Sequence, residues 1–165
     1  MSIILVFAIL NPIFKMITVL QRTSKASVEI EGEIVGQISQ GFVVLLGIAA
    51  EDTAEDIDWL ATKIINLRVF GDAEGKMNLS LLDIAGNILL ISQFTLYANC
   101  KKGNRPSFTD AAKPAIAIPL YEKFIEILQQ KLGKTIATGK FGADMQVSLI
   151  NDGPVTIILD SKNRK

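Results

Sequence analysis

The chain has 165 residues and a net charge of zero, and 49% of its residues are hydrophobic. This length suits one domain with a proper core, and the apolar content argues against intrinsic disorder. Neutrality argues against a protein that coats nucleic acid through bulk charge, although it leaves room for a local basic patch that grips one end of an RNA.

The first 15 residues, MSIILVFAILNPIFK, are set apart by an apolar run from Ile3 to Leu10. This run is shorter than the roughly 20 residues that span a bilayer. It resembles a signal sequence, but no positive charge precedes it and no clear cleavage site follows. We interpret residues 1–15 as an extension or a mis-chosen start outside the fold. A weak targeting or membrane-touching segment and a genuine part of the fold are the alternatives.

The next stretch predicts strands. Ile17–Arg22 is expected to form the first core strand. Apolar and polar residues alternate from Val28 to Ile38, the pattern of a half-buried sheet, with a turn at Glu31-Gly32-Glu33. The continuous apolar run Phe42–Ile48 predicts a central strand that is buried on both faces.

A helix is predicted over residues 54–68, where apolar residues recur at helical spacing after Thr53 as N-cap. Val69 and Phe70 could start a short strand, and residues 71–75 form a turn-rich link. Leu81–Ile91 predicts a hairpin around residues 83–87, with Ile88–Ile91 as its second strand.

The C-terminal part predicts a polar loop, a second helix and two further strands. The loop covers Tyr97–Thr109, and the helix is most secure over Pro119–Leu132, with Pro119 in its first turn and Gly133 as the stop. Strands are expected at Thr135–Thr138 and Met145–Leu159, and the polar tail 162–165 is expected to fray. These elements predict a single α+β domain over residues 16–161, with mixed or antiparallel sheets and two main helices packed in three layers.

Missing residue types limit the chemistry. The chain contains no histidine, which excludes a Ser-His-Asp triad, a Cys-His dyad and any His-bearing zinc site. The one cysteine, Cys100, cannot form an internal disulfide, and no histidine can activate its thiol. We therefore expect no metal and no cofactor. An enzyme on this chain must use carboxylates, hydroxyls, amides, lysines or backbone groups.

Two short segments are candidate sites. Ser92-Gln93-Phe94-Thr95 follows a buried strand, where rigid backbone can aim N–H groups at a ligand, but its hydroxyls could equally bond their own loop. Gly153-Pro154 interrupts a strand pattern and can place two carbonyls with no side chain in the way, although an edge kink or a bulge explains it as well. The basic residues from Lys101 to Arg105 form either a solvated loop or a phosphate clamp.

Taken together, these segments resemble a known family, the D-aminoacyl-tRNA deacylases, over about Met16 to Ser161. The resemblance is carried by Leu20-Gln21-Arg22, residues 41–47, KMNLS at 76–80, SQFTLYA at 92–98, GNRPSF at 103–108, GKFGADM at 139–145 and NDGPVT at 151–156. The combination of SQFTL and NDGPVT is its most specific part. Members of the family usually begin at the methionine that aligns with Met16.

The resemblance implies a homodimeric esterase that cleaves a D-amino acid or glycine from the 3′ end of mischarged tRNA in the cytoplasm. It implies a cis Gly153-Pro154 bond that enters the partner's pocket as a filter against L-amino acids. Pocket residues by the same carry-over are listed here: catalytic, Ser92, Gln93, Phe94 and Thr95; substrate-binding, Asn151, Met145, Ser107 and Phe108; bracing the partner's Gly-Pro loop, Arg22.

The resemblance also bears on mechanism. It implies that backbone N–H groups near Gln93 and Phe94 form an oxyanion hole, and that a ribose hydroxyl of the RNA assists in place of a protein nucleophile. An older idea makes the Thr95 hydroxyl the nucleophile, but the sequence supplies no base for it. A non-catalytic module that binds tRNA ends and an esterase for small molecules are the competing hypotheses, and neither calls for a membrane.

Overall fold

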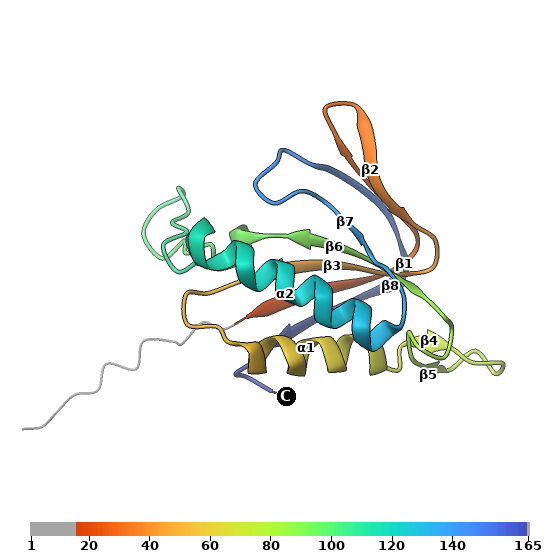
Figure 1. Cartoon of the computed structure of the whole chain (residues 1–165). Coiled ribbons are helices and arrows are strands. Elements are labelled where there is room, and N and C mark those ends of the chain that lie inside the picture. Colours follow the sequence, from red (N-terminus) through yellow and green to blue (C-terminus); the bar gives the residue numbers. More distant parts are fainter. Residues whose placement is uncertain (1–15, 165) are drawn as a thin grey trace, which may run out of the picture.

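The computed structural model describes residues 16–164, so the interpretation of residues 1–15 lies outside it. The elements in chain order are β1 (Ile17–Ile30), β2 (Glu33–Ile38), β3 (Gly41–Gly47), α1 (Ala54–Asn66), β4 (Phe70–Gly71), β5 (Met77–Leu79), β6 (Asn87–Ser92), the 3₁₀ helix η1 (Phe94–Tyr97), α2 (Pro114–Leu132), β7 (Ala137–Thr138) and β8 (Gln146–Asp160). Figure 1 shows the two helices side by side over one face of the sheet.

The main sheet has the strand order β2-β1-β3-β6-β7, and β8 pairs with the other edge of β1. β1 is antiparallel to β2, β3 and β8, whereas β3–β6 and β6–β7 are parallel pairs. β4 and β5 form a separate ribbon. The structure confirms a single mixed α+β domain with two main helices.

The predicted burial of β3 on both faces is confirmed, and it creates two cores. Phe42, Val44 and Leu46 belong to the core that the helices cover. Val43 faces the other way, into a smaller core with Ala26 and with residues of β2, β6 and β8. The outer halves of β1, β2 and β8 therefore fold back over the sheet, and the domain has three layers: helices, central strands and overlying strands (Figure 1).

The C-terminal tail is docked, contrary to the expectation that it frays. Ser161 is fully buried, and its hydroxyl donates to Asp56 of α1 at 2.7 Å. The Lys162 ammonium lies 3.0 Å from the same carboxyl group, and the Arg164 guanidinium stacks over Trp59. The polar composition of the tail hid this contact, because its partner is a charged residue buried on the helix.

The predicted hairpin at residues 81–91 is wrong in its first half. Residues 81–85 form a turn, in which the Ser80 N–H donates to the Asp83 carboxylate at 2.8 Å. Only β6 is extended, and it pairs in parallel with β3. Parallel partners are distant in sequence, so a local turn signal could not reveal this pairing.

The second helix begins five residues earlier than predicted. Pro114, and not Pro119, occupies the first turn, where a proline lacks no needed hydrogen bond. Pro119 lies inside the helix on its exposed side, where water can reach the carbonyl that loses its N–H donor. The predicted end is confirmed, since Gly133 takes the left-handed conformation with φ of 73°.

Candidate active site

A pocket of about 260 Å³ lies where β3 and β6 end, beside the start of α2. Its lining residues are Leu46, Ile48, Ile91, Ser92, Gln93, Phe94, Ala112, Ala117, Phe141, Gly142, Ala143, Met145 and Val147. Four of the predicted site residues, Ser92, Gln93, Phe94 and Met145, are among them. The strand-end segment and the wall at residue 145, which are distant in sequence, therefore form one site.

The segment from Gln93 to Tyr97 folds tightly against the end of β3 because that strand ends in glycine. A Cβ atom on Gly47 would lie 2.9 Å from the Tyr97 ring and 3.3 Å from the Leu96 Cβ. Tyr97 is buried beneath the pocket. Burial, reinforced by the nearby Asp52 carboxylate, raises the pKa of the Tyr97 phenol well above its usual value, so this group stays neutral.

The backbone donors of the segment divide differently from the expectation. The Gln93 N–H donates to the Leu46 carbonyl at 2.7 Å and continues the sheet, so it is not available to an oxyanion. The N–H groups of Phe94 and Thr95 have no acceptor among residues 16–164. The predicted oxyanion hole is therefore corrected by one residue, to Phe94 and Thr95, both of which are exposed.

The side chains of the pocket offer no acid or base. None of its lining residues is charged. The Thr95 hydroxyl accepts a hydrogen bond from the Gln93 amide, which cannot remove its proton. The site can therefore hold and polarise a carbonyl group, but it contains no activated protein nucleophile.

Met145 and Phe108 are placed close to where they were expected. The Met145 sulfur packs on Gly139, where a Cβ would come within 2.3 Å of it. The Phe108 ring meets the Phe94 ring edge-on at 5.2 Å, outside the lining of the pocket. Ser107 is held by a backbone pair with Asn99 and does not line the pocket.

Sequence reasoning missed the apolar wall of the pocket. Phe141, Gly142 and Ala143 come from the link between β7 and β8, and Ala112 and Ala117 flank the start of α2. Such residues carry no chemistry of their own, so composition does not mark them. The two glycines that flank Phe141, Gly139 and Gly142, were the available signal for a closely approached backbone.

The Gly153-Pro154 peptide bond is cis, as the resemblance implied. Both residues are exposed, and they form an unpaired bulge of β8 opposite Arg22. Gly153 has a φ of 137°, and a Cβ there would lie 2.8 Å from the Val155 side chain. This position therefore requires glycine.

Two side chains of the same chain brace this bulge. Arg22 donates from Nε to the Asp152 carbonyl at 2.9 Å, and from Nη1 to the Val69 carbonyl. The Asn151 carbonyl oxygen accepts from the Val155 N–H at 2.9 Å. Arg22 was expected to brace the partner's loop, and the contact seen here is to its own.

The Asn151 amide group is also committed within the chain. It donates to Gln21 at 2.6 Å and to Thr156 at 3.0 Å. These bonds, together with the one from the Val155 N–H, occupy both ends of the amide. Asn151 was expected to bind substrate, but in the structure it fixes the shape of the bulge.

Within one chain the bulge and the pocket lie apart. Arg22, beside the bulge, pairs with Phe42, whereas Ser92, at the pocket, pairs with Leu46 of the same strand β3. Four residues of extended chain correspond to about 13 Å along the strands, and the two strands between β8 and β6 add a lateral separation. One chain therefore does not bring both predicted motifs into one site.

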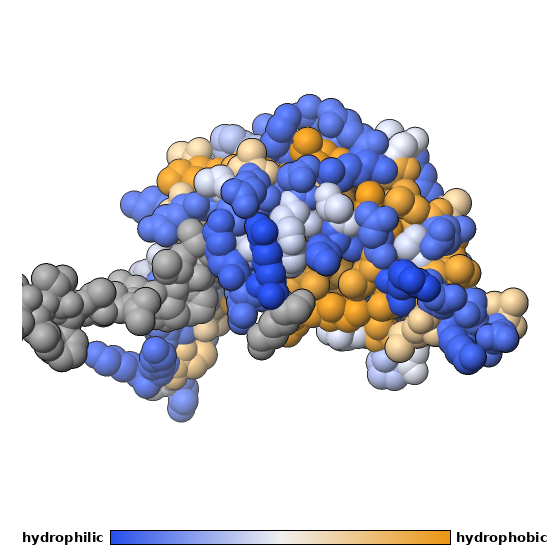
Figure 2. All heavy atoms as spheres, turned by 90° about the horizontal axis from the view of Figure 1, so that it is seen from below, coloured by the Kyte–Doolittle hydropathy of each residue, from blue (hydrophilic) through white to orange (hydrophobic). Residues whose placement is uncertain are grey.

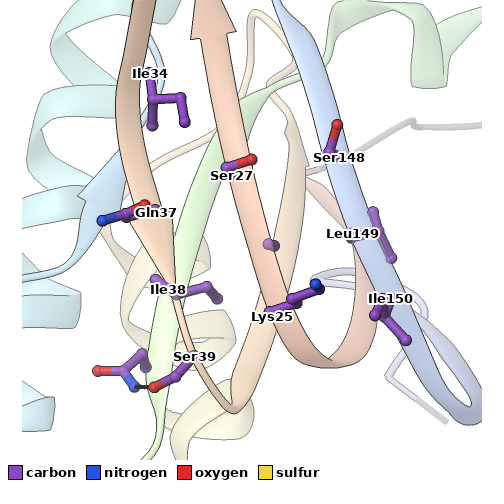
Figure 3. A pocket seen from close by; sticks show the side chains of 11 residues that line it. Lys25, Ser27, Ile34, Gln37, Ile38, Ser39, Ser148, Leu149 and Ile150 are labelled. Carbon is purple, nitrogen blue, oxygen red and sulfur yellow. Dashed lines mark hydrogen bonds between the residues drawn. The ribbon is translucent and has the colours of Figure 1, made fainter.

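A larger hollow, of about 730 Å³, lies over the outer strands (Figure 3). Side chains of β2, β1 and β8 surround it, among them Ile34, Lys25 and Ile150. It contains none of the predicted site residues. We therefore place the candidate active site in the smaller pocket, where the motifs meet.

Two further searches of residues 16–164 were negative. No group of three or more acidic, histidine or cysteine side chains is placed to hold a metal ion within that range. No helix in the described part of the chain has the length and hydropathy to span a bilayer.

Comparisons with known proteins agree with the geometry. The family model described as D-Tyr-tRNA(Tyr) deacylase matches residues 19–160. A D-aminoacyl-tRNA deacylase of Flavobacterium johnsoniae is 56% identical over 150 residues, which cover 91% of this chain and 100% of the relative. One of Bacteroides thetaiotaomicron is 58% identical over 147 residues, covering 89% and 98%.

Solved structures show the same fold. The c-Myc DNA unwinding element binding protein superposes with a TM-score of 0.82 at 45% identity, covering 87% of this chain and 97% of that protein. A probable eukaryotic D-amino acid tRNA deacylase superposes with a TM-score of 0.75 at 17% identity, covering 88% and 98%. With the family model and the curated relatives, these findings show that the chain belongs to the D-Tyr-tRNA(Tyr) deacylase family.

Proposed function

We propose that this protein hydrolyses the ester bond between a D-amino acid and the 3′ end of tRNA, and so removes D-amino acids before they enter protein synthesis. Family membership supports this activity, since relatives that match the chain over their full length are named D-aminoacyl-tRNA deacylases. Glycine wrongly attached to alanine tRNA is a second proposed substrate, since glycine has no side chain to exclude. Because charged tRNA is consumed by ribosomes, we propose a cytoplasmic location.

One observation carries the proposed chemistry: the pocket has free backbone donors and no acid or base. The Phe94 and Thr95 N–H groups lack acceptors in the described chain, and the pocket lining is uncharged. Such donors stabilise the negative charge that develops on an ester carbonyl under attack, and losing one typically costs about 3 kcal/mol in barrier. A ribose hydroxyl of the tRNA would assist the attack, because the pocket offers no protein group for that task.

A second copy of the chain would complete the site. The Gly153-Pro154 bulge is exposed and braced, yet it lies away from the pocket of its own chain. Apolar side chains are exposed on the same strand, with Ile150 50% and Ile158 69% accessible. Figure 2, which views the molecule from the side where α1 and the end of β8 lie, shows apolar surface between charged groups. We propose a homodimer in which each bulge enters the partner's pocket.

This arrangement explains chiral selection by exclusion. A backbone wall that Arg22 and Asn151 hold fixed leaves no space for an L side chain. It needs no affinity for the D side chain, which points outward, so many D-amino acids should be accepted.

The test is incubation with D-tyrosyl-tRNA and L-tyrosyl-tRNA, with release of tyrosine as the readout. We expect hydrolysis of the D ester only. Equal hydrolysis of both esters, or binding of the tRNA with no cleavage of either, would contradict the proposal.

Replacing Thr95 with alanine tests the identity of the nucleophile. Since the Thr95 hydroxyl has only the Gln93 amide beside it, we expect turnover within about threefold of the wild type. A loss of about 100-fold or more, measured in single-turnover deacylation, would instead assign the hydroxyl a chemical role.

Mixing two inactive variants tests the shared site. Gly153→Ala distorts the bulge, and Ala143→Trp fills the pocket, so each should be inactive alone. Subunit exchange produces hybrids in which one site has an intact bulge and an intact pocket. An equal mixture should regain about a quarter of wild-type activity, since half the dimers are hybrids with one good site. No recovery after confirmed exchange would contradict a site built from both chains.

A further inference from the structure

The loop between η1 and α2 concentrates positive charge in an otherwise neutral protein. Lys101, Lys102 and Arg105 are all exposed on it. No Asp or Glu occurs in the sequence between Asp83 and Asp110. The loop therefore presents three positive charges with no acidic residue on the same stretch of chain.

These three charges are also free of ion pairs. Among residues 16–164, the charged groups of Lys101, Lys102 and Arg105 have no carboxylate within salt-bridge distance. Several other cations are paired, such as Lys123 with Glu126 and Lys131 with Asp58. The field of the loop is thus left uncompensated within the described chain, and it favours an anionic partner.

The loop is anchored next to the pocket at both of its ends. Asn99 and Ser107 close it with two backbone hydrogen bonds, of 2.8 and 3.0 Å. Just beyond this closure, the Phe108 ring contacts Phe94, whose side chain lines the pocket and is 57% exposed. In Figure 1 the loop projects beside the start of α2, at the end of β6. A bound ligand at the pocket would therefore have this loop beside it.

Exposed aromatic rings next to free cations are the combination that binds single-stranded nucleic acid, through base stacking and phosphate contacts. We propose that Lys101, Lys102 and Arg105 bind the backbone phosphates of the single-stranded 3′ end of tRNA while its terminal ester lies in the pocket. This inference rests on the proposed function, and it names the part of the substrate that the loop holds.

The first experiment measures binding of uncharged tRNA as a function of salt, which needs no catalysis. Lys101→Ala/Lys102→Ala is compared with Lys63→Ala/Lys123→Ala, a control that removes the same charge from α1 and α2. Each lost contact to single-stranded phosphate should lower the log–log salt slope by about 0.7, so between 50 and 200 mM salt wild-type affinity should fall about sevenfold more than that of the loop variant. The control should keep the wild-type slope.

Further measurements locate the contact. Arg105→Ala should lower the slope by about half as much as the double variant. With tRNA whose single-stranded 3′ end has been removed, loop variant and wild type should bind with the same slope. In deacylation of D-tyrosyl-tRNA, the loop variant should raise KM and leave kcat unchanged. Cleavage of D-tyrosyl-adenosine, which lacks phosphates, should be unaffected.

The outcomes separate the two proposals. An unchanged salt slope in the loop variant, or a change equal to that of the control, overturns the phosphate contact even if D-tyrosyl-tRNA is cleaved normally. Failure of the wild type to cleave any D ester, with the loop-dependent slope intact, overturns the deacylase and keeps the contact. Equal slope changes with intact and truncated tRNA would place the contact elsewhere on the RNA and overturn the assignment to the 3′ end.

Discussion

At the scale of single residues, buried polar contacts hold the ends of the domain in place. Asp56 is fully buried on α1, where it accepts hydrogen bonds from the Thr53 N–H at 2.9 Å and from Ser161 at 2.7 Å. Burial alone would raise the pKa of Asp56, but hydrogen bonds from Ser161, Lys162 and Thr53 outweigh it and lower the pKa. The charged carboxylate therefore stabilises the docked tail.

Replacing Asp56 with asparagine should cost about 2 kcal/mol of unfolding free energy at neutral pH. Because the folded pKa lies below the unfolded value of 3.8, this stabilisation is present above that value and is lost as the pH falls through the folded pKa. The gap between variant and wild type should then shrink below about pH 4 in urea denaturation. Asp58→Asn, on the exposed side of the same helix, should cost less than about 0.5 kcal/mol. A gap that is constant with pH would contradict this account.

The sequence predicted chemistry better at this scale than it predicted bonding. Ser92, Gln93, Phe94 and Met145 were placed correctly at one pocket. The Gln93 N–H was not recognised as part of the sheet, because a hydrogen bond to a distant strand leaves no trace in the residue type. The substrate contact expected of Asn151 likewise gave way to intramolecular bonds.

At the scale of elements, the contact of η1 with the end of β3 decides the shape of the site. Gly47 ends β3 and leaves room for Tyr97 and Leu96. Local patterns predicted β3 and α1 well, because burial on two faces and helical spacing are visible within a few residues. They missed the parallel partner of β6 and the true start of α2, which depend on packing between distant segments.

A Gly47→Ala substitution should reduce kcat/KM for D-tyrosyl-tRNA by about tenfold, because even small displacements of donors weaken transition-state stabilisation. Stability should fall by only about 1–2 kcal/mol, as for other overpacked sites. The control is Gly71→Ala, where a Cβ meets nothing within 4 Å. Both variants are compared by single-turnover deacylation and thermal unfolding. Full activity of Gly47→Ala would show that η1 does not need this close approach.

At the scale of the whole molecule, the fold begins at Met16. Its side chain is fully buried, and its backbone nitrogen donates to Asp52 at 2.8 Å, while the Ala49 N–H donates to the other carboxylate oxygen at 2.7 Å. The relative from Flavobacterium johnsoniae matches 150 residues of this chain over its own full length. We propose that residues 1–15 are not needed for folding.

A chain that starts at Met16 should therefore fold and unfold at the same temperature as the full chain or a higher one. Its free ammonium group would meet the Asp52 carboxylate and form a charge-assisted hydrogen bond. Asp52→Asn should then cost more stability in the shortened chain than in the full one, by about 1 kcal/mol in urea denaturation. Loss of folding on removal of residues 1–15 would refute the proposal.

The continuity of β8 has a consequence for how the proposed pair of sites tolerates change. This strand starts next to Met145 in the wall of its own pocket and runs on to the bulge that would serve the other chain. In a symmetric pair, every substitution in it would thus reach each catalytic centre twice, once from either subunit. A mutational scan should accordingly find β8 far less permissive than its accessibility to water suggests.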